Sequence, residues 1–275
     1  MVHREIWHWI QSYQRESPFT LAEVIETTWQ IFLKRFQFSR QERYLFHPAT
    51  DPFYTVLFEH VYGNWTGRKV MVERSLGQLY AMIKKAFRNL STWKGFQRLQ
   101  VLDPNRILYR DELLEADFLR IPLWIKIDLG YRELNGQVVL IDWKLSRRPE
   151  KKDLLQMAVY GTFARKDVCP TNSIRLIVYY LLEGRAQEWF LEPPLEQMTR
   201  EFIQRSFNKM SDFHARVKRG MGLKDLPPGY QKETCDYCHF RKLCFPGGIP
   251  LMGQPQTLDF RRAEISRSKE RGEWP

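Results

Sequence analysis

Two short apolar runs that each end in an aspartate constrain the fold of this chain more than any other feature. Residues 123–128 read LWIKID, and residues 137–142 read QVVLID. Runs of this length that are rich in β-branched and aromatic residues are typical of strands. The pair Asn135-Gly136 lies between them and is a strong hairpin signal. The sequence therefore predicts an antiparallel hairpin in which Asp128 and Asp142 lie at neighbouring strand ends.

The length of the hairpin loop decides whether the two aspartates meet. A two-residue loop of Asn135-Gly136 would put the carboxylates of Asp128 and Asp142 on opposite faces of the hairpin. A three-residue loop over 134–136, with the glycine in a left-handed conformation, makes the two aspartates direct partners with Cβ atoms ~5 Å apart. We predict the three-residue loop, or a bulge near Gly130 with the same effect, because a metal ion between the carboxylates would remove their repulsion.

Lys144 adds a positive charge to this pair of carboxylates. It follows Asp142 by two positions, so both side chains point to the same face of the strand. Carboxylate oxygens suit Mg²⁺ or Mn²⁺, which can acidify a bound water and polarise a phosphate, and a nearby lysine can stabilise the developing charge. Asp-x-Lys is also a common tripeptide of solvated surfaces. Asp142, however, follows a fully apolar run, which favours a site for metal-dependent phosphodiester hydrolysis.

Helical patterns surround the hairpin and predict an α/β fold. Residues 1–46 read as helical, and the apolar positions of 20–38 follow a period close to 3.6 residues. Residues 173–182 predict a buried strand, and further helices are predicted over 53–64, 67–88, 150–165 and 193–219. We expect a helical region over 1–100 that is partly integral to the core, a core over 101–225, a cysteine segment over 226–250 and a basic tail over 251–275.

The charge balance points to a polyanionic partner. The formal net charge is +11 at pH 7, and nucleic acid is the commonest partner of a basic protein. No run approaches the ~20 apolar residues that cross a bilayer, and the first residues lack the apolar segment of a signal peptide. We therefore expect a cytoplasmic protein that binds DNA and has no membrane partner.

These motifs resemble the PD-(D/E)XK nuclease superfamily, and in particular its RecB-like branch. The matching elements are Asp128, then Asp142-Trp143-Lys144, then Gln156 and Tyr160, whose spacing is that of the branch's Gln-x-x-x-Tyr motif. The resemblance extends to the CRISPR-associated RecB-like exonucleases. It implies a restriction-endonuclease-like core, which is a mixed central sheet flanked by helices, with an N-terminal helical region and a C-terminal cysteine segment.

The resemblance also implies a role for each motif residue. Asp128 and Asp142 would bind Mg²⁺ or Mn²⁺, Lys144 would assist the attacking water, and Gln156 and Tyr160 would shape the active site. The family has one more active-site residue, a histidine or glutamate on an upstream helix. His60 is our first candidate for this catalytic and metal-binding position, and the alternatives are Glu59, Glu73, Glu112 and Glu115.

Three of the four cysteines form a cluster near the C-terminus. Cys235, Cys238 and Cys244 have the spacing of the triplet with which RecB-like nucleases bind a [4Fe-4S] cluster, together with a fourth cysteine near the N-terminus. This chain departs from that pattern, because its remaining cysteine is Cys169. The alternatives are that Cys169 completes an iron–sulfur site, that His239 completes a zinc site, or that the thiols bind no metal.

The sequence thus favours a metal-dependent DNA nuclease, and more specifically an exonuclease of DNA repair, CRISPR or anti-phage defence. A helicase or a CRISPR or defence protein is the partner that the resemblance implies. The alternative is a catalytically inactive nuclease fold that only binds nucleic acid or a partner protein. A structural zinc protein with acidic strands that occur by chance is a third interpretation.

Overall fold

The computed structural model describes residues 2–15, 17–47, 50–57, 73–118, 120–146, 151–168 and 173–220. Met1–Phe207 form one compact unit, and a second unit begins at Asn208. Of the second unit the structure describes 208–220, which form the end of the last helix and the two residues after it. The predicted cysteine segment and basic tail lie outside the described residues.

A mixed five-stranded sheet forms the centre of the first unit. Its strand order is β1-β4-β5-β6-β7, with β1 at Ile107–Tyr109, β4 at Leu129–Arg132, β5 at Val138–Lys144, β6 at Ile174–Tyr180 and β7 at Arg185–Phe190. β5 and β6 pair in parallel, and the other neighbours pair antiparallel. A separate two-stranded sheet consists of β2 (Glu112–Phe118) and β3 (Ile121–Ile127). The predicted α/β fold with a mixed central sheet is confirmed.

Helices precede the sheet and flank it. They are α1 (Val2–Gln14), α2 (Leu21–Arg40), α4 (Glu73–Thr92), α5 (Lys94–Gln100), α6 (Lys151–Asp167) and α7 (Pro193–Lys218), and short 3-10 helices cover Arg43–Leu45 and Pro104–Arg106. α2 begins with a capping box, in which Thr20 Oγ1 accepts a hydrogen bond from Glu23 N and the Glu23 carboxylate accepts one from Thr20 N. None of the described helices is long and apolar enough to cross a membrane.

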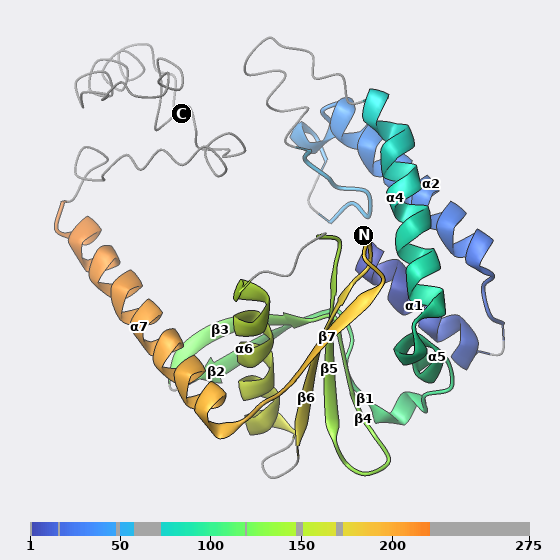
Figure 1. The fold of residues 1–275 in the computed structure, drawn as a ribbon. Coiled ribbons are helices and arrows are strands. Elements are labelled where there is room, and N and C mark those ends of the chain that lie inside the picture. The colour runs from blue at the N-terminus through green and yellow to red at the C-terminus, as the bar shows by residue number, and fades with distance from the viewer. Residues whose placement is uncertain are drawn as a thin grey trace, which may run out of the picture. The chain divides into compact units, whose positions relative to one another are not determined.

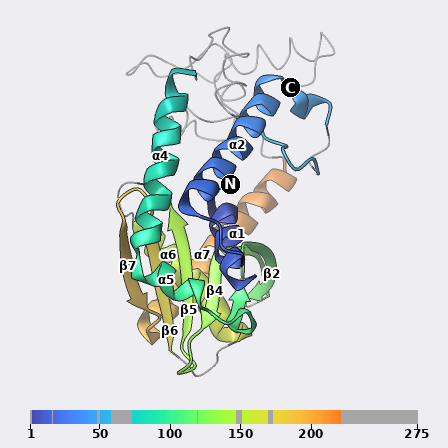
Figure 2. The ribbon, with the colours of Figure 1, turned by 90° about the vertical axis from the view of Figure 1, so that its right-hand side faces the viewer.

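The two faces of the large sheet bury separate apolar cores. Strand side chains alternate between faces, so Val139 and Ile141 of β5 pack in the core shared with α1, α2, α4 and α5. Val138 and Leu140 pack in the core shared with α6. Figure 1 shows these two helical layers on opposite sides of the sheet, and Figure 2 views the first layer lying over the strands. Asp142 continues the second series and therefore faces α6.

The predicted hairpin is bent at Asp128, where the chain passes from the small sheet to the large one. β3 ends at Ile127, β4 begins at Leu129, and Asp128 forms the bend between them. β4 pairs with β5 in a register that joins Leu129 to Ile141. The next position along this register brings Asp128 opposite Asp142.

The loop between β4 and β5 sets that register. Glu133 N donates to Gln137 O at 2.8 Å, and Gly136 N donates to Glu133 O at 2.9 Å, so the loop comprises the three residues 134–136. Gly136 has a φ of 86°, a conformation that glycine adopts without steric cost. The predicted three-residue loop with glycine at the left-handed position is confirmed.

The predicted flanking elements hold in part. The helices over 20–38, 150–165 and 193–219 and the strand over 173–182 are present with small shifts at their ends. The predicted helix over 53–64 is wrong for residues 54–57, which form no regular structure, and its remainder lies outside the described residues. The helix predicted over 67–88 begins, in the described part, at Glu73 and continues to Thr92. Sequence patterns did not resolve β1, β2, β4 or β7 as separate strands.

Gly130 of β4 allows a stability test of the contact between β1 and the sheet. A Cβ atom at this position would overlap the Tyr109 ring and lie 3.0 Å from Leu140 Cδ2. We expect Gly130→Ala to lower the free energy of unfolding by about 1–3 kcal/mol in urea denaturation. The matched control is Gly77→Ala on α4, where an added Cβ meets nothing within 4 Å and should raise stability by about 0.5–1 kcal/mol. A Gly130→Ala protein as stable as the control would contradict this packing.

Candidate active site

Two buried carboxylates form the centre of the candidate site, at the edge of the large sheet where β5 ends. Asp128 is 7% exposed and Asp142 is 3% exposed. The Asp128 carboxylate accepts a hydrogen bond from the backbone N–H of Trp143, with 2.9 Å between Oδ2 and N. This bond ties the bend between β3 and β4 directly to β5 and holds the two acidic side chains together.

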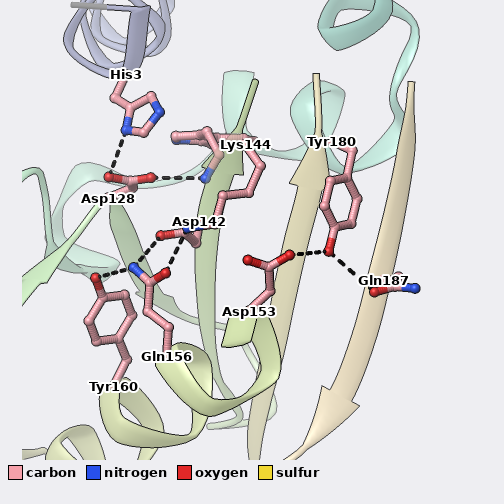
Figure 3. Close-up of polar contacts among 10 residues, drawn as sticks. His3, Asp128, Asp142, Lys144, Asp153, Gln156, Tyr160, Tyr180 and Gln187 are labelled. Atoms are coloured by element: carbon pink, nitrogen blue, oxygen red, sulfur yellow. Dashed lines mark hydrogen bonds and ion pairs between the residues drawn. The ribbon is translucent and has the colours of Figure 1, made fainter. Parts of the chain in front are cut away.

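Lys144 and Gln156 compensate the charge of Asp142 (Figure 3). Lys144 Nζ lies 2.8 Å from Asp142 Oδ2 and donates to Gln156 Oε1 at 2.6 Å. Gln156 Nε2 donates to Asp142 Oδ1 at 3.1 Å and lies 2.6 Å from the hydroxyl of Tyr160. The amide of Gln156 therefore links the acid, the lysine and the tyrosine in one hydrogen-bonded group.

The local structure explains why these side chains meet. Asp142 and Lys144 are two residues apart on β5 and share the face that is covered by α6. Gln156 and Tyr160 are four residues apart on α6 and share one side of that helix. Of the residues predicted for the site, the structure brings together Asp128, Asp142, Lys144, Gln156 and Tyr160.

His3, which was not predicted as a site residue, reaches the same site from the first turn of α1. His3 Nδ1 lies 3.0 Å from Asp128 Oδ1, across 125 positions of sequence (Figure 3). A local signal existed, because His3 shares a helical face with the buried Ile6 and Ile10. The structure gives this half-exposed polar side chain a partner in Asp128.

The surroundings raise the pKa of two groups. Burial is the larger cause for Asp142, the charge of Asp128 is the second, and together they outweigh Lys144 and raise the pKa of Asp142 to about 6. Burial raises the pKa of the Tyr160 hydroxyl to about 12, against the opposing effect of its hydrogen bond with Gln156. Tyr160 therefore keeps its proton at neutral pH, whereas Asp142 changes charge within a mildly acidic range.

The sequence as a whole matches one family model. The model of the PD-(D/E)XK nuclease superfamily matches residues 51–245, which is well over half of the chain. The chain belongs to the PD-(D/E)XK nuclease superfamily. The matched range contains the acidic pair, Lys144, Gln156 and Tyr160, whereas His3 lies before it. No curated protein matches the sequence.

Membership of the PD-(D/E)XK superfamily indicates a nuclease, with nucleic acid as its substrate. Members of the superfamily usually use divalent metals. The described residues contain no cluster of three or more His, Cys, Asp or Glu side chains arranged to hold a metal ion. Among the described residues, Asp128 and Asp142 are therefore the candidate metal ligands.

The acidic pair fits a divalent ion by its chemistry. Mg²⁺ keeps several waters and binds through one or two carboxylates, so Asp128 and Asp142 can suffice as protein ligands. Among the described atoms, the buried Oδ2 of Asp142 accepts no hydrogen bond of good geometry, although the Lys144 ammonium lies 2.8 Å away as an ion pair. Burial is the larger cause of the raised pKa of Asp142, and the charge of Asp128 is the second; a cation bound to the pair would compensate the second cause.

The remaining predicted residues either lie outside the described part of the chain or lie on β2. His60, Glu59, Cys169, Cys235, Cys238, Cys244 and His239 lie outside the described residues, as does the side chain of Glu73. The proposed iron–sulfur or zinc site therefore stays a prediction. The alternatives Glu112 and Glu115 lie on β2 with exposed side chains, and Glu112 pairs with Arg110 at 2.8 Å.

The raised pKa of Asp142 predicts a pH dependence of stability in metal-free protein. The folded state binds this proton up to about pH 6, whereas the unfolded chain releases it near the ordinary pKa of 3.8. The tighter binding of this proton in the folded state adds to the free energy of unfolding. This stabilisation is fully present below pH 3.8 and is lost as the pH rises to about 6. We expect Asp142→Asn to remove this loss, so the variant should gain on the order of 1–3 kcal/mol relative to wild type across the range.

Urea denaturation in EDTA, at several pH values between about 4 and 7, measures this difference. The comparison uses the wild-type protein and the variant at each pH, so that other carboxyl groups cancel. A difference in unfolding free energy that stays constant with pH would contradict a raised pKa at Asp142.

Proposed function

We propose that this chain hydrolyses phosphodiester bonds of DNA in a reaction that depends on Mg²⁺ or Mn²⁺, as an exonuclease of the RecB-like branch. The observation that carries this proposal is the buried pair of Asp128 and Asp142, with the Lys144 ammonium 2.8 Å from one carboxylate. The Gln156 and Tyr160 pair, in contact with the same group, supports the branch. DNA repair, CRISPR and anti-phage defence are the settings that fit this branch, with a helicase or defence protein as partner.

Each residue of the group has a distinct part in the reaction. Asp128 and Asp142 would hold a divalent ion, which would supply Lewis-acid chemistry to the phosphate and acidify the attacking water. As the water oxygen bonds to phosphorus and the bond to the leaving oxygen breaks, negative charge builds on the phosphate oxygens, and the Lys144 ammonium is placed to stabilise it. The water loses a proton to solvent and the leaving oxygen gains one.

Gln156, Tyr160 and His3 hold the reacting groups in position. Gln156 fixes the Asp142 carboxylate and the Lys144 ammonium relative to each other through one planar amide. Tyr160 stays protonated and serves as a hydrogen-bond partner of Gln156, not as a base. His3 restrains the carboxylate of Asp128 through Oδ1, while the Trp143 N–H holds Oδ2.

Substitutions of the acid and the lysine test the proposed function. We expect Asp142→Asn and Lys144→Met each to lower the rate of cleavage of labelled single- and double-stranded DNA by at least about 10²-fold. EDTA should abolish cleavage by the wild-type protein, and Mn²⁺ or Mg²⁺ should restore it. Labelled ends distinguish release of single nucleotides from internal cuts.

Two matched substitutions control for charge removal alone. Asp111→Asn breaks an ion pair with Lys126 of 2.9 Å, at a left-handed position that asparagine tolerates. Lys166→Met removes an ammonium that donates to the carbonyl of Asp117. Both should cleave at the wild-type rate. DNA that shifts in a gel but is never cut by the wild-type protein with any metal would sink the proposed activity and favour a binding module.

The histidine contact gives an independent prediction. Partners that orient a metal-binding carboxylate typically contribute 10–100-fold to activity, so His3→Ala should lower the cleavage rate by about tenfold. His8→Ala is the control, because His8 lies on the same helix, is 47% exposed and contacts Glu5 at 3.4 Å. Equal rates for the two variants would show that the contact of His3 with Asp128 has no part in the reaction.

A further inference from the structure

A further buried carboxylate, that of Asp153, lies beside the candidate site and belongs to none of the groups above. Asp153 is 3% exposed, and its Oδ2 accepts a hydrogen bond of 2.8 Å from the hydroxyl of Tyr180, which is itself fully buried. The same hydroxyl lies 3.3 Å from Oε1 of Gln187 on β7. These three side chains connect the start of α6 with β6 and β7 (Figure 3).

Asp153 and Tyr180 both lie next to residues of the candidate site. Asp153 is in the first turn of α6, three residues before Gln156, so both project from one side of the helix. Tyr180 is the last residue of β6 and is paired in register with Lys144 of β5. The hydrogen bond between them therefore joins the strand beside the lysine to the helical turn that carries the glutamine.

Packing alone does not explain this pair. Burying a carboxylate is costly even when it is paired, and apolar side chains of similar volume often stabilise a core at least as well. A hydrogen bond differs from an apolar contact in being directional, because it restricts both the distance and the angle between two elements. The Gln156 amide needs such restriction, since its contacts of 2.6–3.1 Å reach Asp142, Lys144 and Tyr160 at once.

We propose that Asp153 and Tyr180 are positioning residues for the proposed nuclease reaction. Their hydrogen bond fixes the first turn of α6 against the end of β6, and it thereby holds the Gln156 amide between the Asp142 carboxylate and the Lys144 ammonium. Neither residue touches the substrate. This inference rests on the proposed function, because its effect is on the alignment of the groups that carry out cleavage.

The other end of α6 provides a matched control. Asp167, the last residue of α6, accepts a hydrogen bond of 2.8 Å from the hydroxyl of Tyr109 on β1. Tyr109 is 6% exposed and Tyr180 is fully buried, so Tyr109→Phe and Tyr180→Phe each remove the hydroxyl of a buried tyrosine that donates to an aspartate of α6. The acceptors differ, because Asp167 is exposed and Asp153 is buried. The pairs differ in their distance along α6 from Gln156.

The test compares the two variants in DNA cleavage and in thermal unfolding. We expect both to lower the melting temperature, and Tyr180→Phe to lower it more, because Asp153 is buried and Asp167 is exposed to water. Tyr180→Phe alone should lower kcat by about 10–100-fold with KM changed less than about twofold, as for a small misplacement of catalytic groups. Tyr109→Phe should keep the wild-type kcat. Equal kcat values for the two variants would overturn the proposal.

Substitutions of Asp153 separate positioning from a direct chemical part. Asp153→Asn keeps an oxygen that can accept from Tyr180 and should retain most of the wild-type kcat, whereas Asp153→Ala should lose as much as Tyr180→Phe. An asparagine variant as inactive as the alanine variant, in a folded protein, would show that the charge of Asp153 is required and would overturn the positioning role. If the wild-type protein cuts no DNA at all, the proposed function is wrong. If the wild-type protein cuts DNA and the Tyr180→Phe and Tyr109→Phe variants have equal kcat values, only the positioning role is wrong.

Discussion

The structure depends on two carboxylates that are held together where water cannot screen them. Asp128 and Asp142 are both almost fully buried, and like charges in such a place oppose folding. The chain compensates this repulsion with a backbone N–H on Asp128, an ammonium and an amide on Asp142 and an imidazole from α1. The elements that supply these groups, β5, α6 and α1, all contribute buried side chains to the two apolar cores. The cores therefore hold in place a pair of charges that would otherwise separate.

Because strand side chains alternate, the two faces of the sheet have different roles: one packs against the N-terminal helices and the other carries the acidic site. One residue series of β5 packs under the N-terminal helices, and the other packs under α6 and ends in Asp142 and Lys144. A shift of one residue in the register of β4 and β5 would turn the acidic pair apart, because every side chain would change face. The three-residue loop with Gly136 at positive φ prevents that shift. A turn far from the chemistry thus decides whether the acidic side chains can act together.

The parts of the site that depend on residues close together in the sequence could be predicted from it. The loop register, the shared face of Asp142 and Lys144, and the shared face of Gln156 and Tyr160 all follow from the periods of strand and helix. The contact of His3 with Asp128 could not be derived in this way, because 125 positions separate the two and the docking of α1 on the sheet is a tertiary event. The bend at Asp128 was missed for a related reason, since a continuous strand and a strand that changes sheets have the same alternating pattern. β1 has three residues, which is too short for an alternating pattern to be recognised. β7 is partly exposed and half of its residues are polar, so its pattern is weak.

The packing of α6 explains why directional bonds are needed at both of its ends. Ala158, Gly161 and Ala164 face the sheet, and a Cβ added at Gly161 would lie 3.0 Å from Leu176 Cδ2, so the helix approaches the strands closely. Small side chains interlock weakly, and apolar contacts of this kind do not by themselves prevent a helix from rotating or sliding. The hydrogen bonds of Asp153 with Tyr180 and of Asp167 with Tyr109 oppose both motions, because each fixes one end of the helix to a different strand. Polar contacts at both ends therefore restrict the helix that carries Gln156, whose amide contacts both Asp142 and Lys144.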